Sequence, residues 1–286
     1  MNDLEIRPAT LDEFSTAVEW AANEGWNPGN DDLEVFHSVD PSGFLMAWKS
    51  SQPVASISVV NYSADFGFLG FYIVHPDFRG TGAGMAIWNV GMEHLADRTI
   101  GLDGVVHQQE NYQKSGFVYA GRNIRITGIP DFDKANGFTG VIRNYEIADT
   151  PALLKYDRLH FPANRENFTR AWTDPNFGPG RRTRIAVIDN QVIGYGTLRA
   201  CRSGYKIGPL FANDEQIARG LFEALCCDIS DYSEVSIDVP EANSAAISMA
   251  KQYGLEPVFE TARMYRGSIT PLPLATTFGI TTFELG

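Results

Sequence analysis

The strongest structural signal in this chain is Val74-His75-Pro76-Asp77-Phe78-Arg79-Gly80-Thr81-Gly82-Ala83-Gly84. Three alternating glycines here join an apolar run to a helical pattern that begins at about Met85. Glycines let backbone N–H groups approach a ligand closely, and a helix N-terminus offers unpaired donors and the positive end of its dipole. The stretch therefore predicts a loop that binds the phosphate of a ligand.

Two common phosphate-binding motifs fit this stretch poorly. No Lys-Ser or Lys-Thr pair follows the last glycine, so the P-loop of nucleoside triphosphatases is excluded. A dinucleotide fingerprint fits Gly82-Ala83-Gly84 in part, but Ile87 stands where a third small residue is needed. Asp103 lies about twenty residues further on, where a ribose-binding acid is expected. An NAD-dependent dehydrogenase is therefore kept as a remote alternative.

The pattern Val-x-Pro-x-x-Arg-Gly-x-Gly-x-Gly resembles the acyl-CoA-binding motif of the GNAT acyltransferase superfamily, and residues 74–84 fill every position of it. A second motif resembles the helix end that carries the family's usual catalytic tyrosine: Asn111-Tyr112-Gln113-Lys114-Ser115-Gly116-Phe117. Two separate motifs in the right order favour this family. The resemblance implies an N-acetyltransferase that uses acetyl-CoA as its cosubstrate.

The predicted elements of the first half agree with this family. Thr10-Leu11-Asp12-Glu13 is typical of a capping box and predicts a helix after a short strand. Extended runs at 44–48, 54–62 and 66–74 precede the glycines, and a helix, a strand at 102–106, a short helix and a strand from 117 follow. We expect an α/β (α+β) fold with a mixed, mostly antiparallel sheet flanked by helices. The resemblance implies that this sheet splays between its fourth and fifth strands.

The second half of the chain repeats this plan. Strands are predicted at 145–147, 184–188, 192–198, 205–211 and 235–239, and helices at 151–159, 217–227 and from Asn243. We therefore expect two tandem GNAT-like domains, at residues 1–134 and 135–286, with the boundary in the Gly/Pro/Asp-rich stretch 128–140.

The second copy lacks the residues that carry the chemistry. Residues 209–215 have no glycine and contain two acids, and Ala250 stands where the tyrosine is expected. This half resembles the degenerate C-terminal half of tandem GNAT proteins of the YitH-like kind, including the ending at 279–286.

Composition limits the possible partners and locations. A net charge of −12 disfavours nucleic acid, since phosphate binding needs clustered Lys and Arg. The three cysteines, Cys201, Cys226 and Cys227, match neither a metal-site spacing nor a disulfide framework, so we expect no metal and reduced thiols. The first residues lack a signal-peptide pattern and no long apolar run follows. We therefore predict a cytoplasmic protein without a membrane partner.

The resemblance implies a binding site for the coenzyme on this chain. Backbone groups of the fourth strand are expected to pair with pantetheine, and N–H groups of the glycine loop to hold the pyrophosphate, with the tyrosine helix flanking the site. The residues expected to bind the cofactor are Tyr72, Ile73, Val74, Arg79, Gly80, Thr81, Gly82, Ala83, Gly84, Asn111 and Lys114.

Acyl transfer to an amine needs a proton for the departing thiolate and a neutral amine. The family motif makes Tyr112 the expected general acid, because a tyrosine hydroxyl can donate to a thiolate. His107, which follows the fifth strand, is the candidate base, because histidine side chains commonly act as general bases. Glu110, His75 or water are the alternatives.

The acceptor is expected to contact the region between the first two helices and the strand faces. Candidates are Trp26, Asp31 and Phe71, because an aromatic and acidic wall suits a cationic amine. Trp20, Asp32 and Tyr72 are further candidates. A core role for Trp20 and a helix N-terminal role for Asp31 and Asp32 are the alternatives.

The expected acceptor is thus an amine-bearing small molecule or peptide. A non-catalytic acyl-CoA sensor is the main alternative function. The sequence leaves open whether two copies form a homodimer.

Overall fold

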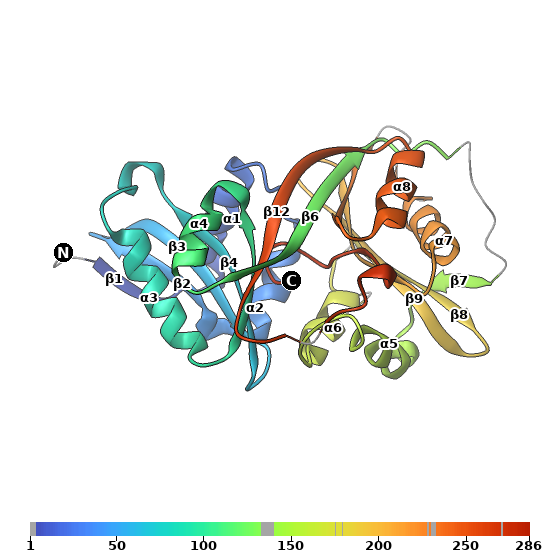
Figure 1. The fold of residues 1–286 in the computed structure, drawn as a ribbon, viewed down its shortest axis with the longest axis horizontal. Coiled ribbons are helices and arrows are strands. Elements are labelled where there is room, and N and C mark those ends of the chain that lie inside the picture. The colour runs from blue at the N-terminus through green and yellow to red at the C-terminus, as the bar shows by residue number, and fades with distance from the viewer. Residues whose placement is uncertain are drawn as a thin grey trace.

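A computed structural model of the chain describes residues 4–132, 140–174, 176–178, 180–227, 229, 233–269 and 271–286. Figure 1 shows two lobes side by side, with two long strands, β6 and β12, crossing between them. Strand β1, which begins at Leu4, lies at the outer edge of the first lobe, and the C-terminal end lies in the middle of the molecule (Figure 1). The predicted boundary between residues 134 and 135 lies outside the described residues.

The first half has the predicted order of elements. Its helices and strands are β1 (Leu4–Pro8), α1 (Leu11–Asn23), α2 (Asp32–Val39), β2 (Phe44–Lys49), β3 (Gln52–Asn61), β4 (Phe66–Val74), α3 (Ala83–Leu95), β5 (Thr99–Val105), α4 (Gln109–Lys114) and β6 (Val118–Gly128). The predicted capping box is confirmed, because the Thr10 hydroxyl accepts from the Glu13 N–H and the Glu13 carboxylate accepts from the Thr10 N–H.

The second half repeats this order, except that its first strand lies earlier in the sequence than predicted and a short strand, β13, follows β12. Its elements are β7 (Val141–Asn144), α5 (Thr150–Asp157), α6 (Glu166–Thr173), β8 (Arg181–Ile188), β9 (Gln191–Ala200), β10 (Tyr205–Ala212), α7 (Glu215–Cys226), β11 (Val235–Pro240), α8 (Ser244–Gln252), β12 (Glu256–Arg266) and β13 (Thr277–Gly279). The predicted strand at 145–147 was wrong. Asp149 accepts from the Glu146 N–H and turns the chain there into α5, so the strand ends at Asn144.

All described strands form one sheet, in the order β1-β2-β3-β4-β5-β12-β6-β11-β10-β9-β8-β7, with β13 pairing with β10. The lobes therefore exchange their last strands. β12, from the second half, pairs with β5 of the first lobe, and β6, from the first half, pairs with β11 of the second. The expected mixed, mostly antiparallel fold is confirmed, but the two sheets are continuous through β12 and β6.

Helices cover both faces of this sheet. In the first lobe α3 packs on one face, around Ile57, Ile87 and Leu102, while α1 and α2 cover the other. Helix α6 of the second half joins that second core, since the Trp172 ring stacks on Phe36. In the second lobe α7 and α8 pack on one face and α5 on the other.

The last ten residues, 277–286, are buried between the lobes. Arg165 donates to the Thr281 hydroxyl and to the Gly286 carbonyl, and the Tyr62 hydroxyl of the first lobe donates to the Leu285 carbonyl. We call residues 280–286 the central tail. Its backbone hydrogen bonds are supplied by both lobes, so its course depends on their packing.

Candidate active site

The sheet of the first lobe opens between β4 and β5. These parallel strands pair only over Phe66–Leu69 and Thr99–Leu102, and they diverge beyond that point. A register shift against β3 marks a bulge in β4, where Phe71 takes a φ of 46°. Non-glycine residues rarely adopt positive φ, and bulges near active sites re-aim the backbone. The bulge therefore turns the edge of β4, from Gly70 to Val74, toward the gap.

The glycine loop lies at the end of this gap. Gly80 and Gly82 have φ values of 77° and 92°, which favour glycine, and a Cβ on either would meet open space. Helix α3 begins behind them without a side-chain cap, so the N–H groups of its first turn keep free donors. Unpaired amides at a helix N-terminus are suited to bind phosphate. The loop thus fits the diphosphate of a coenzyme.

Gly84 keeps the first turn of α3 close to β4. A Cβ at this position would lie 3.0 Å from the Tyr72 hydroxyl and 2.9 Å from a Val74 methyl group. The Tyr72 ring in turn packs on Trp88 of α3, with ring centroids 5.2 Å apart. The Tyr72 side chain therefore lies between β4 and the first turns of α3.

Arg79 does not point freely into the loop. Its guanidinium donates to Glu24 at 2.7 Å and to the Val74 carbonyl at 3.1 Å. These bonds tie the loop to the end of α1 and to the edge of β4. The Arg79 guanidinium is thus engaged by Glu24 and by the Val74 carbonyl, while its backbone belongs to the loop that the motif predicts. In the same turn, the Thr81 hydroxyl donates a hydrogen bond to the Phe78 carbonyl.

A cavity of about 320 Å³ fills the gap. It passes from the α3 side of the sheet, where Tyr112 and Leu102 line it, to the opposite side, where Trp26 and Thr261 do. A thioester and an acceptor could therefore approach each other from opposite faces. The remaining lining residues are Glu24, Leu69, Gly70, Phe71, Tyr72, Ile73, Val74, Arg79, Asp103, Gly104, Val105, His107, Gln108, Phe259, Phe283 and Glu284.

Tyr112 lies in this cavity with 8% of its surface exposed. Its ring packs between Trp88 and Phe117, and Gly104 makes room for it, since a Cβ there would lie 2.3 Å from the ring. No described residue forms a hydrogen bond with its hydroxyl. Burial, with a smaller effect from Tyr72, raises the pKa of Tyr112 above its usual value, so the hydroxyl keeps its proton at neutral pH.

The other motif residues lie less deep. His107 follows β5, in the turn Val106–Gln108, and reaches the cavity although it is exposed. Asn111 and Lys114 are exposed on α4 outside the cavity lining, and they bond to Gln108 and to each other. The structure thus brings Tyr112 and His107 to one cavity.

The predicted acceptor residues separate into two groups. Trp26 lines the cavity, and its carbonyl accepts from Arg125 and Lys206 across the lobe boundary. Phe71 lines it through its bulged backbone, because its ring is buried against Phe14 in the core.

Asp31 is not brought to the cavity. Its carboxylate packs against the backbone of Gly178 and Gly180, and the neighbouring Asp32 is buried with Arg181 and Arg199. These acids join the lobes, so the expected acidic wall at 31–32 is absent.

Asp103 has no free carboxylate for a ribose. Arg263 and Asn123 donate to it at 2.9 Å and 2.7 Å, and the three side chains join β5, β12 and β6. The dehydrogenase alternative therefore loses its expected ligand.

Sequence reasoning missed the part of the cavity wall that comes from the second half. Phe259 and Thr261 belong to the exchanged strand β12, and Phe283 and Glu284 belong to the central tail. One signal could have pointed to the tail. Gly70 lies inside a strand, where glycine often marks a close backbone approach, and a Cβ there would lie 2.0 Å from the Glu284 carbonyl.

The second lobe has the same opening, but its own chain closes it. β10 and β11 pair in parallel only over Tyr205–Ile207 and Val235–Ile237. Beyond that point β13 pairs with β10, and the Ile280 N–H donates to the Asp238 carbonyl of β11 at 2.8 Å. Ala250 is fully buried in the core, and Asp214 caps α7. This lobe therefore has neither the open gap nor the free helix N-terminus of the first.

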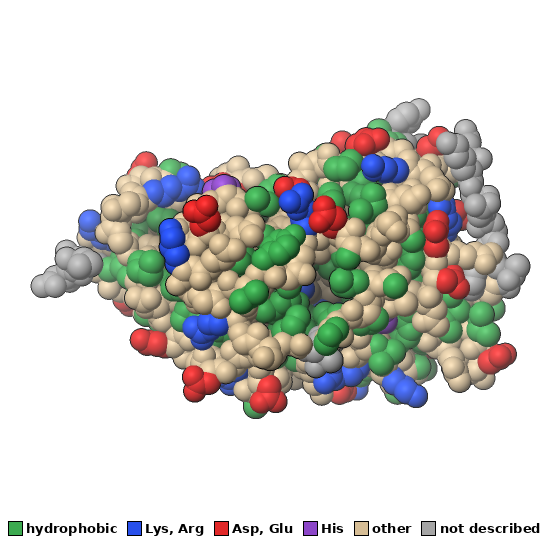
Figure 2. Space-filling model, in the orientation of Figure 1, with side chains coloured by type: hydrophobic (Ala, Val, Ile, Leu, Met, Phe, Trp, Pro, Cys, Tyr) green, Lys and Arg blue, Asp and Glu red, His purple; other side chains and the backbone are tan. Residues whose placement is uncertain are grey.

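The molecular surface carries charged side chains of both signs. Figure 2 shows acidic and basic side chains interspersed on one face, with hydrophobic side chains over its middle. The described residues contain no cluster of His, Cys, Asp and Glu that could hold a metal ion. Within the same ranges, every helix is too short or too polar to cross a membrane.

Comparisons with known proteins match both halves. A model described as Acetyltransferase (GNAT) family matches residues 7–117, and one described as Acetyltransferase (GNAT) domain matches residues 153–279. Holothin acyltransferase from Pseudoalteromonas sp. (strain SANK 73390) is 33% identical over 263 residues, which cover 91% of this chain and 87% of that protein.

Solved structures agree in fold. A Pyrococcus horikoshii protein of proposed acetyltransferase function superposes with a TM-score of 0.81 at 22% identity, over 100% of this chain and 97% of that one. A tandem GNAT protein from the clavulanic acid biosynthesis pathway superposes with a TM-score of 0.64 at 16% identity, over 94% and 99%. These similarities extend over both lobes.

Proposed function

This chain belongs to the GNAT acyltransferase superfamily as a tandem, two-lobe member, and from that premise we propose that its first lobe is an N-acetyltransferase. It transfers the acetyl group of acetyl-CoA to a primary amine of a small molecule or peptide. The observation that carries the proposal is the open gap between β4 and β5, with a glycine loop at its end and the buried Tyr112 in its wall.

Coenzyme binding is assigned to the backbone. The N–H groups of Gly82, Ala83 and Gly84 are free to hold the diphosphate, and the edge of β4 at Tyr72, Ile73 and Val74 is free to pair with the pantetheine arm. An N–H of this edge would also donate to the oxyanion that develops on the thioester carbonyl, where preorganised donors give the largest effect. Asn111 and Lys114 would contact only the outer part of the coenzyme.

Tyr112 is the proposed general acid. A departing thiolate takes up a proton readily, and a buried tyrosine keeps one available because burial raises its pKa. Its ring is fixed by Trp88 and Phe117, so the hydroxyl has a defined position in the cavity. The proposed route ends with the proton on the coenzyme sulfur.

The acceptor is proposed to be a small amine. The cavity volume of about 320 Å³ is at the lower end for small-molecule sites. The relative named holothin acyltransferase supports an acceptor of small-molecule size. Trp26 and the Phe71 backbone would form part of its wall, and His107 at the cavity rim is a candidate to exchange protons with solvent.

The protein is proposed to act in the cytoplasm. Cys201, Cys226 and Cys227 are free thiols, which agrees with a reducing compartment. A homodimer is a separate prediction, which sedimentation velocity tests.

The test follows free thiol during incubation with acetyl-CoA and one amine at a time. The panel contains amino acids, polyamines, aminoglycosides, holothin and short peptides, and each reaction is compared with one that lacks the acceptor. We expect thiol release and an acetylated product with at least one amine. Tight acetyl-CoA binding in calorimetry without turnover on any amine would overturn the proposal and favour the acyl-CoA sensor.

A further inference from the structure

The central tail brings one unusual carboxylate to the proposed acceptor side of the cavity. Among the described residues, the acidic residues buried as a whole are Asp32, Asp157, Asp238 and Glu284, and the side chain of Asp103 is buried with Arg263. The first three aspartates each pair with arginine. Glu284 is 4% exposed and lines the cavity, yet its Oε1 atom has no hydrogen-bond partner in the described parts of the chain. A buried carboxylate oxygen without a donor is costly, so its retention calls for a ligand.

The position of Glu284 is fixed from both sides. Its carbonyl packs against Gly70 at the bulged edge of β4, and the preceding Phe283 ring stacks under the Arg125 guanidinium, 4.7 Å from it. On the other side the Leu285 N–H donates to the Thr282 hydroxyl at 2.9 Å, and the Leu285 carbonyl accepts from Tyr62. The backbone of Glu284 is therefore held where the gap in the sheet opens, and its side chain lines the cavity there.

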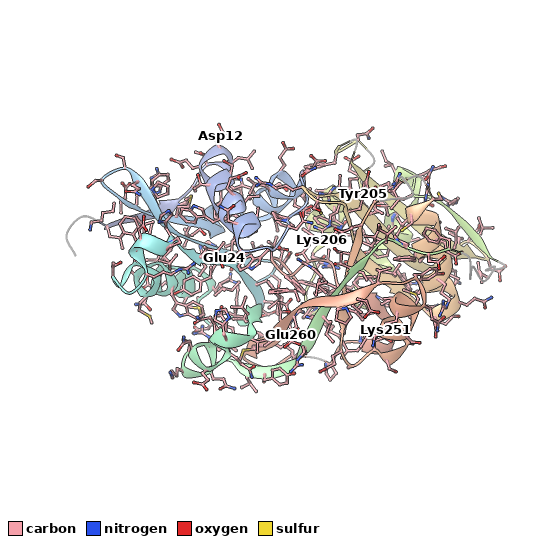
Figure 3. All side chains as sticks on the ribbon, turned by 90° about the horizontal axis from the view of Figure 1, so that it is seen from above. Asp12, Glu24, Tyr205, Lys206, Lys251 and Glu260 are labelled. Carbon is pink, nitrogen blue, oxygen red and sulfur yellow. The ribbon has the colours of Figure 1, made fainter. Side chains whose placement is uncertain are left out.

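The two cationic side chains near Glu284, Arg125 and Lys206, donate their hydrogen bonds to other residues. Arg125 makes two bonds to Asp238, at 2.7 and 2.8 Å, and a third to the Trp26 carbonyl. Lys206, which lies in the middle of the molecule in Figure 3, donates to the same carbonyl at 2.8 Å. Burial, followed by the charge of Arg125, lowers the pKa of Lys206 to about 8, while Glu284 and Asp238 oppose this. Neither cation donates directly to Glu284.

Building on the proposed function, we infer that Glu284, supplied by the degenerate second lobe, binds the ammonium group of the acceptor and removes the proton that makes it a nucleophile. The unpaired Oε1, the cavity position and the anchored tail point to this role.

The proton balance closes. Glu284 takes one proton from R–NH3⁺ and later releases it to solvent. The neutral amine then forms the new C–N bond as the C–S bond breaks, and the thiolate takes the proton of Tyr112. The nitrogen loses a second proton, which restores Tyr112, and keeps the third in the amide. The sum is R–NH3⁺ plus acetyl-CoA giving the amide, CoA–SH and one proton.

The test compares wild type with Glu284→Gln across pH 6.5 to 9.5, using an amine that the panel has shown to be a substrate. We expect kcat/KM at pH 7 to fall about 100-fold, while the Kd for acetyl-CoA stays within about twofold. The variant can use only amine that is already neutral, so its kcat/KM should rise about tenfold per pH unit up to the amine pKa. Wild type should stay nearly flat over that range.

Other titratable or charged groups face the same space and could contribute to these profiles. They are Glu24, Tyr72, Arg79, Asp103, His107, Tyr112, Arg125 and Lys206. The matched control is Glu260→Gln, because Glu260 lies on β12 but pairs with Arg122 at the surface. Its pH profile should coincide with that of wild type.

The outcomes separate the two proposals. No turnover with any amine overturns the function and this inference together. An active wild type with an unchanged Glu284→Gln variant, or with a loss that is independent of pH, overturns only the inference. If Glu284→Gln does not fold, Glu284→Asp replaces it, because aspartate keeps the negative charge but its shorter side chain holds the carboxylate further from the cavity. The pH profile of wild type alone can also decide. A tenfold rise in its kcat/KM per pH unit would overturn the role of Glu284.

Discussion

The two lobes share the same order of strands, and in each lobe two parallel strands diverge. The resulting opening stays empty of protein in the first lobe and is filled by the chain in the second. In the first lobe β4 and β5 separate and leave a cavity, whereas in the second β13 fills the space between β10 and β11. Backbone groups exposed by a splayed sheet need partners. The second lobe supplies them from its own chain, while the first leaves them for a ligand. A duplicated fold can thus keep its core after losing its site.

The central tail connects the two openings. A Cβ on Gly70 of β4 would lie 2.0 Å from the Glu284 carbonyl, and a Cβ on Gly208 of β10 would lie 2.2 Å from the Thr281 carbonyl. The tail therefore passes both splayed strands at equivalent close approaches. This arrangement gives the second lobe a direct part in the first lobe's cavity.

The largest expected effect tests the closed opening. Phe278 of β13 is 1% exposed in the second-lobe core, so Phe278→Ala should lower the free energy of unfolding by about 4 kcal/mol in urea denaturation. Calorimetry should still find one acetyl-CoA per chain, because this lobe lacks the glycine loop. Phe278→Leu is the control and should cost about 1 kcal/mol. A second coenzyme bound by Phe278→Ala would break the comparison.

Tyr112→Phe tests the open site. Without the proton donor, kcat should fall about 100-fold, which corresponds to about 3 kcal/mol in the barrier, with the Kd for acetyl-CoA unchanged. Tyr253→Phe is the matched control, since Tyr253 is a buried tyrosine next to the end of α8 that bonds to Glu223. Equal rates for Tyr112→Phe and wild type would remove the general acid from the proposal.

The first lobe also carries an acid-sensitive contact. Burial alone would raise the pKa of Asp40, but hydrogen bonds from His94, the Asn61 N–H and Ser42 outweigh it and lower the pKa to about 2. A depressed carboxyl pKa contributes stability above the unfolded value near 4 and loses it as pH falls toward 2. Asp40 should therefore account for about 2 kcal/mol of the stability that wild type loses over this range in denaturant titrations.

Asp40→Asn should lose about 2 kcal/mol less than wild type over the same pH range, because the other carboxyls with lowered pKa values remain. Asp65→Asn is the control, because Asp65 is exposed and its carboxylate makes no hydrogen bond to other described residues. Identical acid sensitivity in wild type and Asp40→Asn would show that another group is responsible.

The smallest effect compares two left-handed glycines. Gly82→Ala should weaken acetyl-CoA binding about tenfold, or about 1.4 kcal/mol, because the φ of 92° at Gly82 favours glycine and the loop must deform. Gly254 in the second lobe has a similar φ of 80°. Gly254→Ala should therefore lower the free energy of unfolding about as much as Gly82→Ala does, without changing the Kd for acetyl-CoA. Equal affinity for both variants, measured by calorimetry, would contradict a role for the loop in binding.

Local sequence predicted much of this molecule. The strand, glycine loop and helix of residues 66–95 follow from an apolar run, positive-φ glycines and helical spacing, and all three are local effects. The position of Tyr112 in the cavity agrees with its motif. The prediction that Asp31 lines the acceptor site was wrong, because two neighbouring acids cannot be told apart from the sequence. Arg181 and Arg199, from the distant strands β8 and β9, bury Asp32, whereas Asp31 packs against the backbone of Gly178.

The sequence by itself therefore determined two copies of one fold and the half that keeps the glycine loop and tyrosine, because periodicity, turn residues and motifs act over short distances. Only the tertiary structure decided that β6 and β12 change places, that β13 closes the second opening and that Glu284 reaches the first. These depend on strand pairing and ion pairs between residues more than a hundred positions apart, such as Arg125 with Asp238, and no local pattern encodes such distances.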